Sequence, residues 1–325
     1  MTVLQCGMAK SGNYWVYQIV RALLRVGGVP ERSFIQSHLV FQDAQRWQLS
    51  AKDQARIDAV AVERGNCYAV ISSAFKERIV DLPAYVRSCS HIWTHAPWSR
   101  PLEEMFIRAP RRLYIIRDPR DVALSMARFA FSPYYKEYFG TREPDEATYL
   151  RHRIYGMTVK WVRHVGGYLM HGLPMGLHVV FYERLLKDPI SEVAALAKYL
   201  DLTVDDLALR AVTSETGFES MRRQDPAHVR RGRAGDWRNA LTDSQQEQVA
   251  RLAGPMLSLL GYPVRAEHDW PPELDRAIEP RQIARAVRAA NGGVWDKVRL
   301  GWALIASRRP LWQKVRRGTS FMLGG

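Results

Sequence analysis

Short apolar runs alternate with longer amphipathic segments along most of the chain. An apolar run at residues 2–7 precedes a segment with helical spacing of its apolar residues, from about Asn13 to Arg25. A helical pattern also follows the run at 111–119, and another covers 188–200, where an Asp-Pro pair is typical of a helix start. The apolar runs with the length of a buried strand are 2–7, 67–73, 91–94, 111–119 and 176–182.

This order of elements predicts an α/β fold with a central parallel sheet flanked by helices on both faces. The carboxyl ends of parallel strands lie at one edge of such a sheet, and ligands bind beyond that edge. The residues that directly follow the strands are therefore the first candidates for a binding site.

The positive charge of the chain is concentrated at its end. The formal net charge is +14, and residues 281–325 contain ten Lys and Arg against one Asp, so nine of these charges lie there. An excess of this size indicates an anionic partner, such as a nucleotide, a nucleic acid, a membrane surface or an acidic substrate. Cys6, Cys67 and Cys89 show no spacing typical of a metal site, and we expect reduced thiols.

The segment after the first predicted strand has the composition of a phosphate-binding loop. Gly12 permits a close approach of the backbone, and the N–H groups at the start of the following helix attract anions. Lys10, Ser11 and Asn13 add a positive charge and side-chain hydrogen-bond donors. The order Lys-Ser-Gly differs from the loop of nucleotide triphosphatases, in which Gly-Lys-Ser/Thr follows four free positions, and this disfavours a P-loop kinase.

Two further clusters have the composition of anion-binding sites. Arg117 lies at the carboxyl end of the predicted strand, and Ser125 follows two helical turns later. Taken alone, this pair is equally compatible with a helix capped by Asp118 and an exposed arginine. The second cluster consists of Arg230, Arg231 and Gly232. Taken alone, it is also compatible with a basic surface loop.

Together these motifs resemble those of the sulfotransferases that use 3′-phosphoadenosine 5′-phosphosulfate (PAPS). They are similar, in the order of the chain, to the family's 5′-phosphosulfate loop, its catalytic-histidine segment, its 3′-phosphate motif, the segment after a central strand and the C-terminal cofactor clamp. The matching segments are AKSGNYW (9–15), THAP (94–97), RDPRDVALSMARF (117–129), FYERLLKDP (181–189) and RRGRAGDWRNALT (230–242).

The resemblance implies a P-loop-like sulfotransferase fold over residues 1–267. It implies transfer of a sulfuryl group from PAPS to an acceptor hydroxyl or, as a less favoured choice, an amine, with PAP (3′-phosphoadenosine 5′-phosphate) as the product and no metal. His95 would act as the general base and Lys10 would stabilise the leaving phosphate. The implied cofactor-binding residues are Lys10, Ser11, Gly12, Asn13, Tyr14, Trp15, Arg117, Ser125, Tyr182, Arg230, Arg231 and Gly232.

Several positions depart from the family pattern. Trp93 stands where many cytosolic relatives have a lysine near the catalytic histidine, which leaves more of the charge stabilisation to Lys10 or to another cation. Ala9 replaces the usual loop proline, and Tyr14 replaces the usual threonine. Asp243 interrupts the segment that forms dimers in the family, so dimerisation by that route is not expected and the oligomeric state is left open.

The acceptor cannot be named from the sequence, because variable loops build this site in the family. Aromatic residues near the motifs are candidates for its wall, since such side chains line apolar or sugar-stacking pockets. In the alternative interpretation, half of them belong to the core. The acceptor is a small molecule, a lipid, a glycan or a natural product. The candidate wall residues are Trp93, Trp98, Phe129, Phe131, Tyr134 and Tyr135.

The end of the chain reads as an extension of the catalytic domain. Residues 268–280 are Pro-rich and acidic and predict a linker, and residues 281–325 predict a basic helical tail that contains Trp295 and Trp302. Tryptophan beside Lys and Arg on an amphipathic helix is typical of a helix that lies on an anionic membrane. The alternatives are packing on the catalytic domain or on a partner subunit; a nucleic acid is not expected.

No targeting segment or membrane span is recognisable, and we expect a cytoplasmic protein, with association to a membrane surface through the tail. The alternative function is a non-catalytic relative that senses a nucleotide or docks on membranes. The presence of Lys10, His95, Arg117 and Ser125 favours the enzyme, because an inactive relative tolerates the loss of at least one of them.

Overall fold

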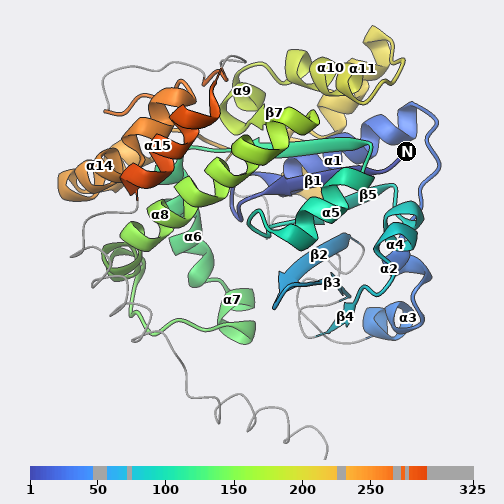
Figure 1. Ribbon diagram of the computed structural model, residues 1–325, viewed down its shortest axis with the longest axis horizontal. Coiled ribbons are helices and arrows are strands. Elements are labelled where there is room, and N and C mark those ends of the chain that lie inside the picture. Colours follow the sequence, from blue (N-terminus) through green and yellow to red (C-terminus); the bar gives the residue numbers. More distant parts are fainter. Residues whose placement is uncertain (47–56, 72–74, 225–231, 266–271, 275–277, 291–325) are drawn as a thin grey trace, which may run out of the picture. The chain divides into compact units, whose positions relative to one another are not determined.

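One seven-stranded sheet forms the centre of the protein (Figure 1). A computed structural model describes residues 1–46, 57–71, 75–224, 232–265, 272–274 and 278–290. The strand order is β4-β3-β2-β5-β1-β6-β7. The strands are β1 (Val3–Gly7), β2 (Asp58–Glu63), β3 (Asn66–Val70), β4 (Lys76–Arg78), β5 (His91–Thr94), β6 (Arg111–Ile116) and β7 (His178–Phe181).

Most of the sheet is parallel. Strands β2, β5, β1, β6 and β7 run in the same direction, and β3 and β4 extend the sheet as antiparallel strands at one edge. In the central strand, Cys6 pairs with Thr94 of β5 and with Tyr114 of β6. The loops that follow β1, β5 and β6 therefore leave the sheet at the same edge. The predicted parallel sheet is confirmed. The predicted strand at 67–73 exists as β3, but it is antiparallel to its neighbours because it follows β2 through a tight turn, and β4 was not predicted.

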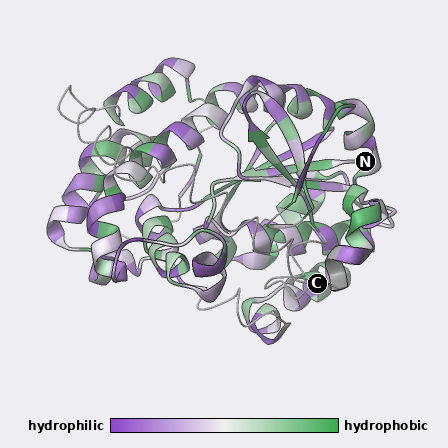
Figure 2. Cartoon of the chain, turned by 90° about the horizontal axis from the view of Figure 1, so that it is seen from below, coloured by the Kyte–Doolittle hydropathy of each residue, from purple (hydrophilic) through white to green (hydrophobic). Residues whose placement is uncertain are grey.

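Side chains of the central strands alternate between two hydrophobic clusters, one on each face of the sheet. In β6, Leu113 and Ile115 pack into one cluster, whereas Tyr114 and Ile116 pack into the other. Most helices in Figure 2 carry both hydrophobic and hydrophilic residues, as expected for amphipathic helices that cover a sheet. The predicted arrangement of helices on both faces is thus confirmed.

The cluster that contains Leu113 receives α1 (Asn13–Val26), α9 (Tyr182–Lys187), α10 (Pro189–Tyr199), α11 (Asp206–Glu215) and α12 (Phe218–Gln224). The opposite cluster receives α4 (Leu82–Ser88), α5 (Arg100–Arg108), α6 (Pro119–Ala130), α8 (Glu146–Gly172), α13 (Trp237–Ala240), α14 (Asp243–Leu259) and α15 (Pro280–Ala290). The short helices α2 (Phe34–Ser37), α3 (Leu39–Arg46) and α7 (Pro133–Tyr138) lie between these elements in the chain.

Helix α8 is the longest described helix and connects the sheet to the C-terminal helices (Figure 1). It begins at a cap in which the Asp145 carboxylate accepts a hydrogen bond from the Thr148 N–H group. Trp161 and Tyr168 of α8 are fully buried against the sheet. Because α6, α14 and α15 also pack against α8, this helix fixes the position of a large part of one face.

Helix α15 belongs to the same compact unit as the sheet, which extends from Met1 to Ala290. Ile283, Ala286 and Ala290 are buried, and α15 packs against α8 and α14. Residues 291–325, which form most of the expected basic tail, lie outside the described residues, so the membrane-binding tail stays a prediction. Within the described part of the chain, no helix is long and apolar enough to cross a membrane.

Candidate active site

The loop between β1 and α1 leaves the start of α1 open. Lys10 and Gly12 adopt left-handed backbone conformations, with φ of 71° and 95°. The loop is closed by hydrogen bonds from Asn13 Nδ2 to the Met8 carbonyl, at 2.8 Å, and from the Ser11 N–H group to the same oxygen, at 3.2 Å. No side chain of the described residues caps α1. Its first N–H groups and the positive end of its dipole are therefore available to an anion.

Two residues of β1 hold this loop in place. Gln5 is fully buried, and its Nε2 atom donates a hydrogen bond to the Asn13 carbonyl at 2.7 Å. At Gly7, a Cβ atom would lie 2.4 Å from Asn13 Oδ1 and 2.6 Å from a methyl group of Ile115. Only glycine therefore lets Asn13 approach the end of β1 closely enough to close the loop.

Three aromatic rings from three helices meet beside the loop. Trp15 of α1 packs edge-to-face against Tyr182 of α9, at 5.7 Å between centroids, and against Phe218 of α12, at 6.2 Å. Two glycines touch these rings, because a Cβ atom on Gly12 would lie 2.5 Å from Tyr182, and one on Gly232 would lie 2.4 Å from Phe218. The loop and the candidate clamp thus border one aromatic cluster, and the structure adds Phe218 to the residues that the sequence indicated.

Arg117 connects the loop to the candidate clamp. Its guanidinium lies 4.2 Å from the centroid of Tyr182 and donates hydrogen bonds to the carbonyls of Lys10, at 3.4 Å, and Arg233, at 2.9 Å. The Nε atom of Arg117 is buried and has no hydrogen-bond partner among the described residues. A buried, unpartnered donor on a cation favours an anionic ligand at this position. Ser125 is half-buried on α6, two turns further along the helix.

Helix α6 anchors the segment that follows Gly232. The Asp121 carboxylate accepts hydrogen bonds from the N–H groups of Gly235, at 2.7 Å, and Trp237, at 3.3 Å. Burial raises the pKa of Asp121 to about 6, while the nearby Arg117 charge opposes the shift, so the group is ionised at pH 7. Arg120 lies over the Trp237 ring at 3.5 Å and is buried rather than exposed. Arg230 and Arg231 lie outside the described residues, and their contacts stay a prediction.

His95 follows β5 at the same edge of the sheet. Its Nδ1 atom lies 2.7 Å from the Gly7 carbonyl, which can only accept, so Nδ1 carries the proton and Nε2 is the basic atom. Burial of the ring, together with the charges of Lys10 and Lys160, lowers the pKa of His95, against the opposing effect of the Gly7 hydrogen bond. The residue as a whole remains exposed, and solvent weakens this shift. The ring is neutral at pH 7 in either case, because its ordinary pKa is near 6.5.

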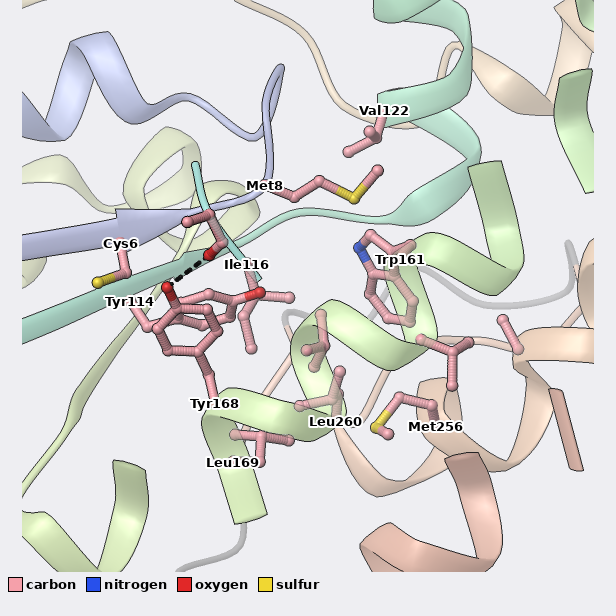
Figure 3. Close-up of a cluster of buried hydrophobic side chains, with 14 of the residues drawn as sticks. Cys6, Met8, Tyr114, Ile116, Val122, Trp161, Tyr168, Leu169, Met256 and Leu260 are labelled. Atoms are coloured by element: carbon pink, nitrogen blue, oxygen red, sulfur yellow. Dashed lines mark hydrogen bonds between the residues drawn. The ribbon is translucent and has the colours of Figure 1, made fainter. Parts of the chain in front are cut away.

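Helix α8 holds the backbone that carries His95. The His164 ring donates through Nε2 to the His95 carbonyl at 3.2 Å and accepts a hydrogen bond from the Tyr114 hydroxyl at 2.7 Å. The Tyr168 hydroxyl donates to the Ala96 carbonyl at 2.8 Å. Tyr114 and Tyr168 stack at 4.3 Å between centroids, and Figure 3 shows them together beside β1. The backbone at His95 is therefore held from the face of the sheet that α8 covers.

Comparison with known proteins places this architecture in a family. The model of the sulfotransferase domain matches residues 2–261 of the chain. The chain belongs to the sulfotransferase family. It is 27% identical to mouse sulfotransferase 1B1 over 48% of this chain and 57% of that protein, and 22% identical to rabbit amine sulfotransferase over 49% and 58%. These matches span little more than half of each relative. Rabbit sulfotransferase 1C2 is 23% identical over 77% of the chain and 81% of its own length.

Solved sulfotransferase-like structures share the fold. The mouse sulfotransferase SULT7A1 complexed with PAP superimposes with a TM-score of 0.52 and 20% identity, over 79% of this chain and 83% of that one. A retinol dehydratase in a complex with retinol and PAP gives a TM-score of 0.51 and 15% identity, over 83% of both chains. At these identities the similarity establishes the fold of the chain and nothing further.

Part of the expected acceptor wall lies next to the loop between β1 and α1. The Lys10 ammonium lies 4.1 Å from the ring centroid of Phe129, at the end of α6. Tyr134 and Tyr135 of α7 pack against Phe129, at 6.0 and 5.4 Å between centroids. Trp93 lies edge-to-face with the His95 ring at 5.2 Å. The structure therefore brings these four aromatic residues to the catalytic candidates.

Two expected wall residues have other neighbours. Trp98 stacks on His171 of α8 at 5.3 Å and packs edge-to-face against Phe106 and Tyr168. Phe131 packs against Tyr149 of α8, at 6.3 Å between centroids. These contacts attach both side chains to α8, and Trp98 also to α5. Their contact with an acceptor stays a prediction.

The sequence analysis missed Phe218, Asp121, His164 and Tyr168. Their contacts join segments far apart in the chain, and the only local sign was the second Asp in the RDPRD segment. Among the described residues, no group of three or more His, Cys, Asp or Glu side chains is placed to hold a metal ion.

Proposed function

We propose that this protein transfers the sulfuryl group of PAPS to a hydroxyl group, or less favourably an amine, of an acceptor. Membership of the family supports this, and so do two solved structures with the same fold that are complexes with PAP. The decisive observation is the buried, unpartnered Nε of Arg117 beside an uncapped helix start, since this pairing suits a ligand with two separate phosphate groups.

The donor would lie along the edge formed by the loop, the aromatic cluster and the clamp. In this proposal the N–H groups of α1, with Lys10, Ser11 and Asn13, bind the 5′-phosphosulfate. Tyr14 and Trp15 complete that side, and Trp15, Tyr182 and Phe218 surround the adenine. The 3′-phosphate would be held by Arg117, Ser125, Arg230, Arg231 and Gly232.

Transfer would combine positioning with charge stabilisation. When bound, PAPS supplies an activated sulfuryl group with a phosphate as its leaving group. Nε2 of His95 accepts the proton of the acceptor hydroxyl as the new oxygen–sulfur bond forms. The Lys10 ammonium and the N–H groups of α1 stabilise the negative charge that develops on the bridging oxygen as the old bond breaks. His95 can act in this way because its ring is neutral at pH 7.

Calorimetric titration with PAP tests the cofactor. We expect micromolar binding to the full-length protein, at least a tenfold loss in Arg117→Ala, and no comparable binding of ATP. Circular dichroism confirms that the variant is folded. If folded wild-type protein does not bind PAP, or binds ATP equally well, the proposal is wrong.

The acceptor is proposed only by class. The aromatic wall of Phe129, Tyr134 and Tyr135 beside Lys10 suits an apolar or ring-containing molecule. A lipid acceptor at a membrane surface would agree with the basic tail. Co-sedimentation with anionic vesicles tests this part, with full-length protein compared with a chain that ends at Ala290 and so keeps α15. Equal binding of both would exclude the tail as a membrane anchor.

A further inference from the structure

Lys10 has an unusual backbone conformation and a defined side-chain contact. Its φ of 71° lies in the left-handed region, which is unfavourable for a residue with a Cβ atom. Its ammonium nevertheless lies over the face of Phe129, at 4.1 Å from the ring centroid. At this distance the negative face of an aromatic ring attracts a cation.

The ring of Phe129 is itself held in place. Tyr134 stacks on it at an interplanar angle of 30°, and Tyr135 meets it at 72°. The Ser132 N–H group and hydroxyl both donate hydrogen bonds to the Phe129 carbonyl, at 3.0 and 2.7 Å, which ends α6 at this point. A ring fixed on two sides defines where the ammonium rests.

Phe129 also occupies a particular position on α6. It lies four residues after Ser125, and residues with this spacing are neighbours on one face of a helix. One face of α6 therefore carries a candidate 3′-phosphate residue and, one turn later, the ring that holds Lys10. Arg117, just before α6, is likewise held over an aromatic ring, that of Tyr182 at 4.2 Å.

We propose that Phe129 is a positioning residue, whose ring face holds the Lys10 ammonium in place for the 5′-phosphosulfate before the donor binds. This role rests on the proposed donor site. It assigns to Phe129 a task on the donor side, in addition to any contact with the acceptor. Leucine at this position has similar bulk but no ring face, whereas tyrosine keeps the face.

A spectroscopic measurement tests the contact without a ligand. The lysines of the full-length protein are converted to carbon-13 dimethyl-lysine, which keeps the positive charge, and the Lys10 resonance is assigned from its loss in Lys10→Arg. We expect an upfield ring-current shift for Lys10, its loss in Phe129→Leu and its recovery in Phe129→Tyr. Phe34→Leu serves as the control, since Phe34 is half-buried and packs against His38 and Tyr85. An unshifted Lys10 resonance in the wild type would overturn the contact.

A double-mutant cycle for PAP binding tests the role. We expect Phe129→Leu to weaken PAP binding about three- to fivefold, with Phe129→Tyr close to the wild type. In a Lys10→Met background the same substitution should have no effect, because the cation that the ring holds is gone. An equal loss in both backgrounds would identify Phe129 as merely structural and overturn the proposal. If the wild type does not bind PAP at all, the donor site is wrong, and the Phe129–Lys10 contact is judged by its resonance alone.

Discussion

Gly12 is the residue at which the donor loop and the aromatic cluster constrain each other. Its φ of 95° favours glycine, and the Tyr182 ring leaves no room for a methyl group. Two independent requirements therefore apply to one position. A second glycine, Gly28, has a φ of 67° but no atom near the position of a Cβ, so it separates the two effects.

We expect Gly12→Ala to lose PAP binding by at least tenfold, because either the loop or the Tyr182 ring must move. Gly28→Ala should cost about 1 kcal/mol of the free energy of unfolding, through the left-handed conformation alone, and should leave PAP affinity unchanged. Urea unfolding and calorimetry measure the two quantities. Equal affinities for the two variants would contradict the role assigned to Gly12.

Lys160 is a cation near the catalytic candidates that the sequence did not indicate. It lies one turn before His164 on α8, and its charge contributes to the lowered pKa of His95. Lys160→Gln should therefore raise the pKa of His95, so that the base becomes protonated at a higher pH. NMR titration of the His95 ring measures this, with its resonance assigned from His95→Asn. Lys198→Gln, on α10 at the other face of the sheet, should leave the titration unchanged.

At the residue scale, the sequence indicated side chains whose chemistry can be read locally. Lys10, Gly12 and Arg117 lie in the connections that follow β1 and β6, where polar groups meet at the sheet edge. Phe218 and His164 act through contacts with Trp15 and His95, which lie far away in the chain. No local pattern marks such a contact, because it exists only after the helices have packed.

At the scale of elements, α6 supports both sides of the proposed donor site. Its first turn anchors the clamp segment through Asp121, and its last turn carries Phe129. The apolar pattern predicted the helix itself. The pattern could not show that a carboxylate in the first turn would accept hydrogen bonds from two N–H groups more than a hundred residues away.

We expect Asp121→Asn to weaken PAP binding roughly tenfold, because an amide has one acceptor oxygen where the carboxylate uses two, and the bonds to a charged group are lost. Arg128→Ala, which removes an ion pair of 3.7 Å to Asp236 in the same segment, should change the affinity less than threefold, since partly exposed pairs contribute little. Calorimetry compares the two. A larger effect of Arg128→Ala would place the anchor elsewhere.

For the whole molecule, buried histidines make stability depend on pH. Burial lowers the pKa of His164 to about 4. A lowered folded-state pKa contributes stability that is present above the unfolded value near 6.5 and is lost as the pH falls toward 4. Asp121 and Glu183 act in the opposite direction, because burial raises their pKa values to about 6 and about 7. The contribution of His164 is therefore visible only as a difference between variants.

We expect the wild type to lose about 2 kcal/mol more of its free energy of unfolding than His164→Gln between pH 7.5 and pH 5. Glutamine can still donate to the His95 carbonyl but does not titrate. Urea unfolding at both pH values gives the two differences. Parallel losses in the two proteins would show that His164 is not the group that takes up the proton.

The whole fold was predictable as a class but not in its details. The runs that became β1, β5, β6 and β7 were recognisable because strands buried on both faces are almost continuously apolar. Strands β2 and β4 and the helix α8 were not. Both strands contain charged residues, β4 also lies at the edge of the sheet, and the apolar side of α8 is interrupted by polar residues. The packing of α15 depends on two small buried residues, Ala286 and Ala290. Alanine is common both in cores and on surfaces, so a hydrophobic pattern does not predict its burial.

The central position of β1 has a consequence for the order in which the chain can fold. In the described part of the chain, β1 pairs with β5 and β6, which follow it and begin at His91 and Arg111. A ribosome must therefore release more than a hundred residues before the donor loop has its two neighbouring strands. Pairings over such separations close slowly, because chain entropy is lost before the contacts form. The loop with the candidate phosphate-binding groups thus stays beside an unpaired strand during this interval, in which chaperones or aggregation compete for it.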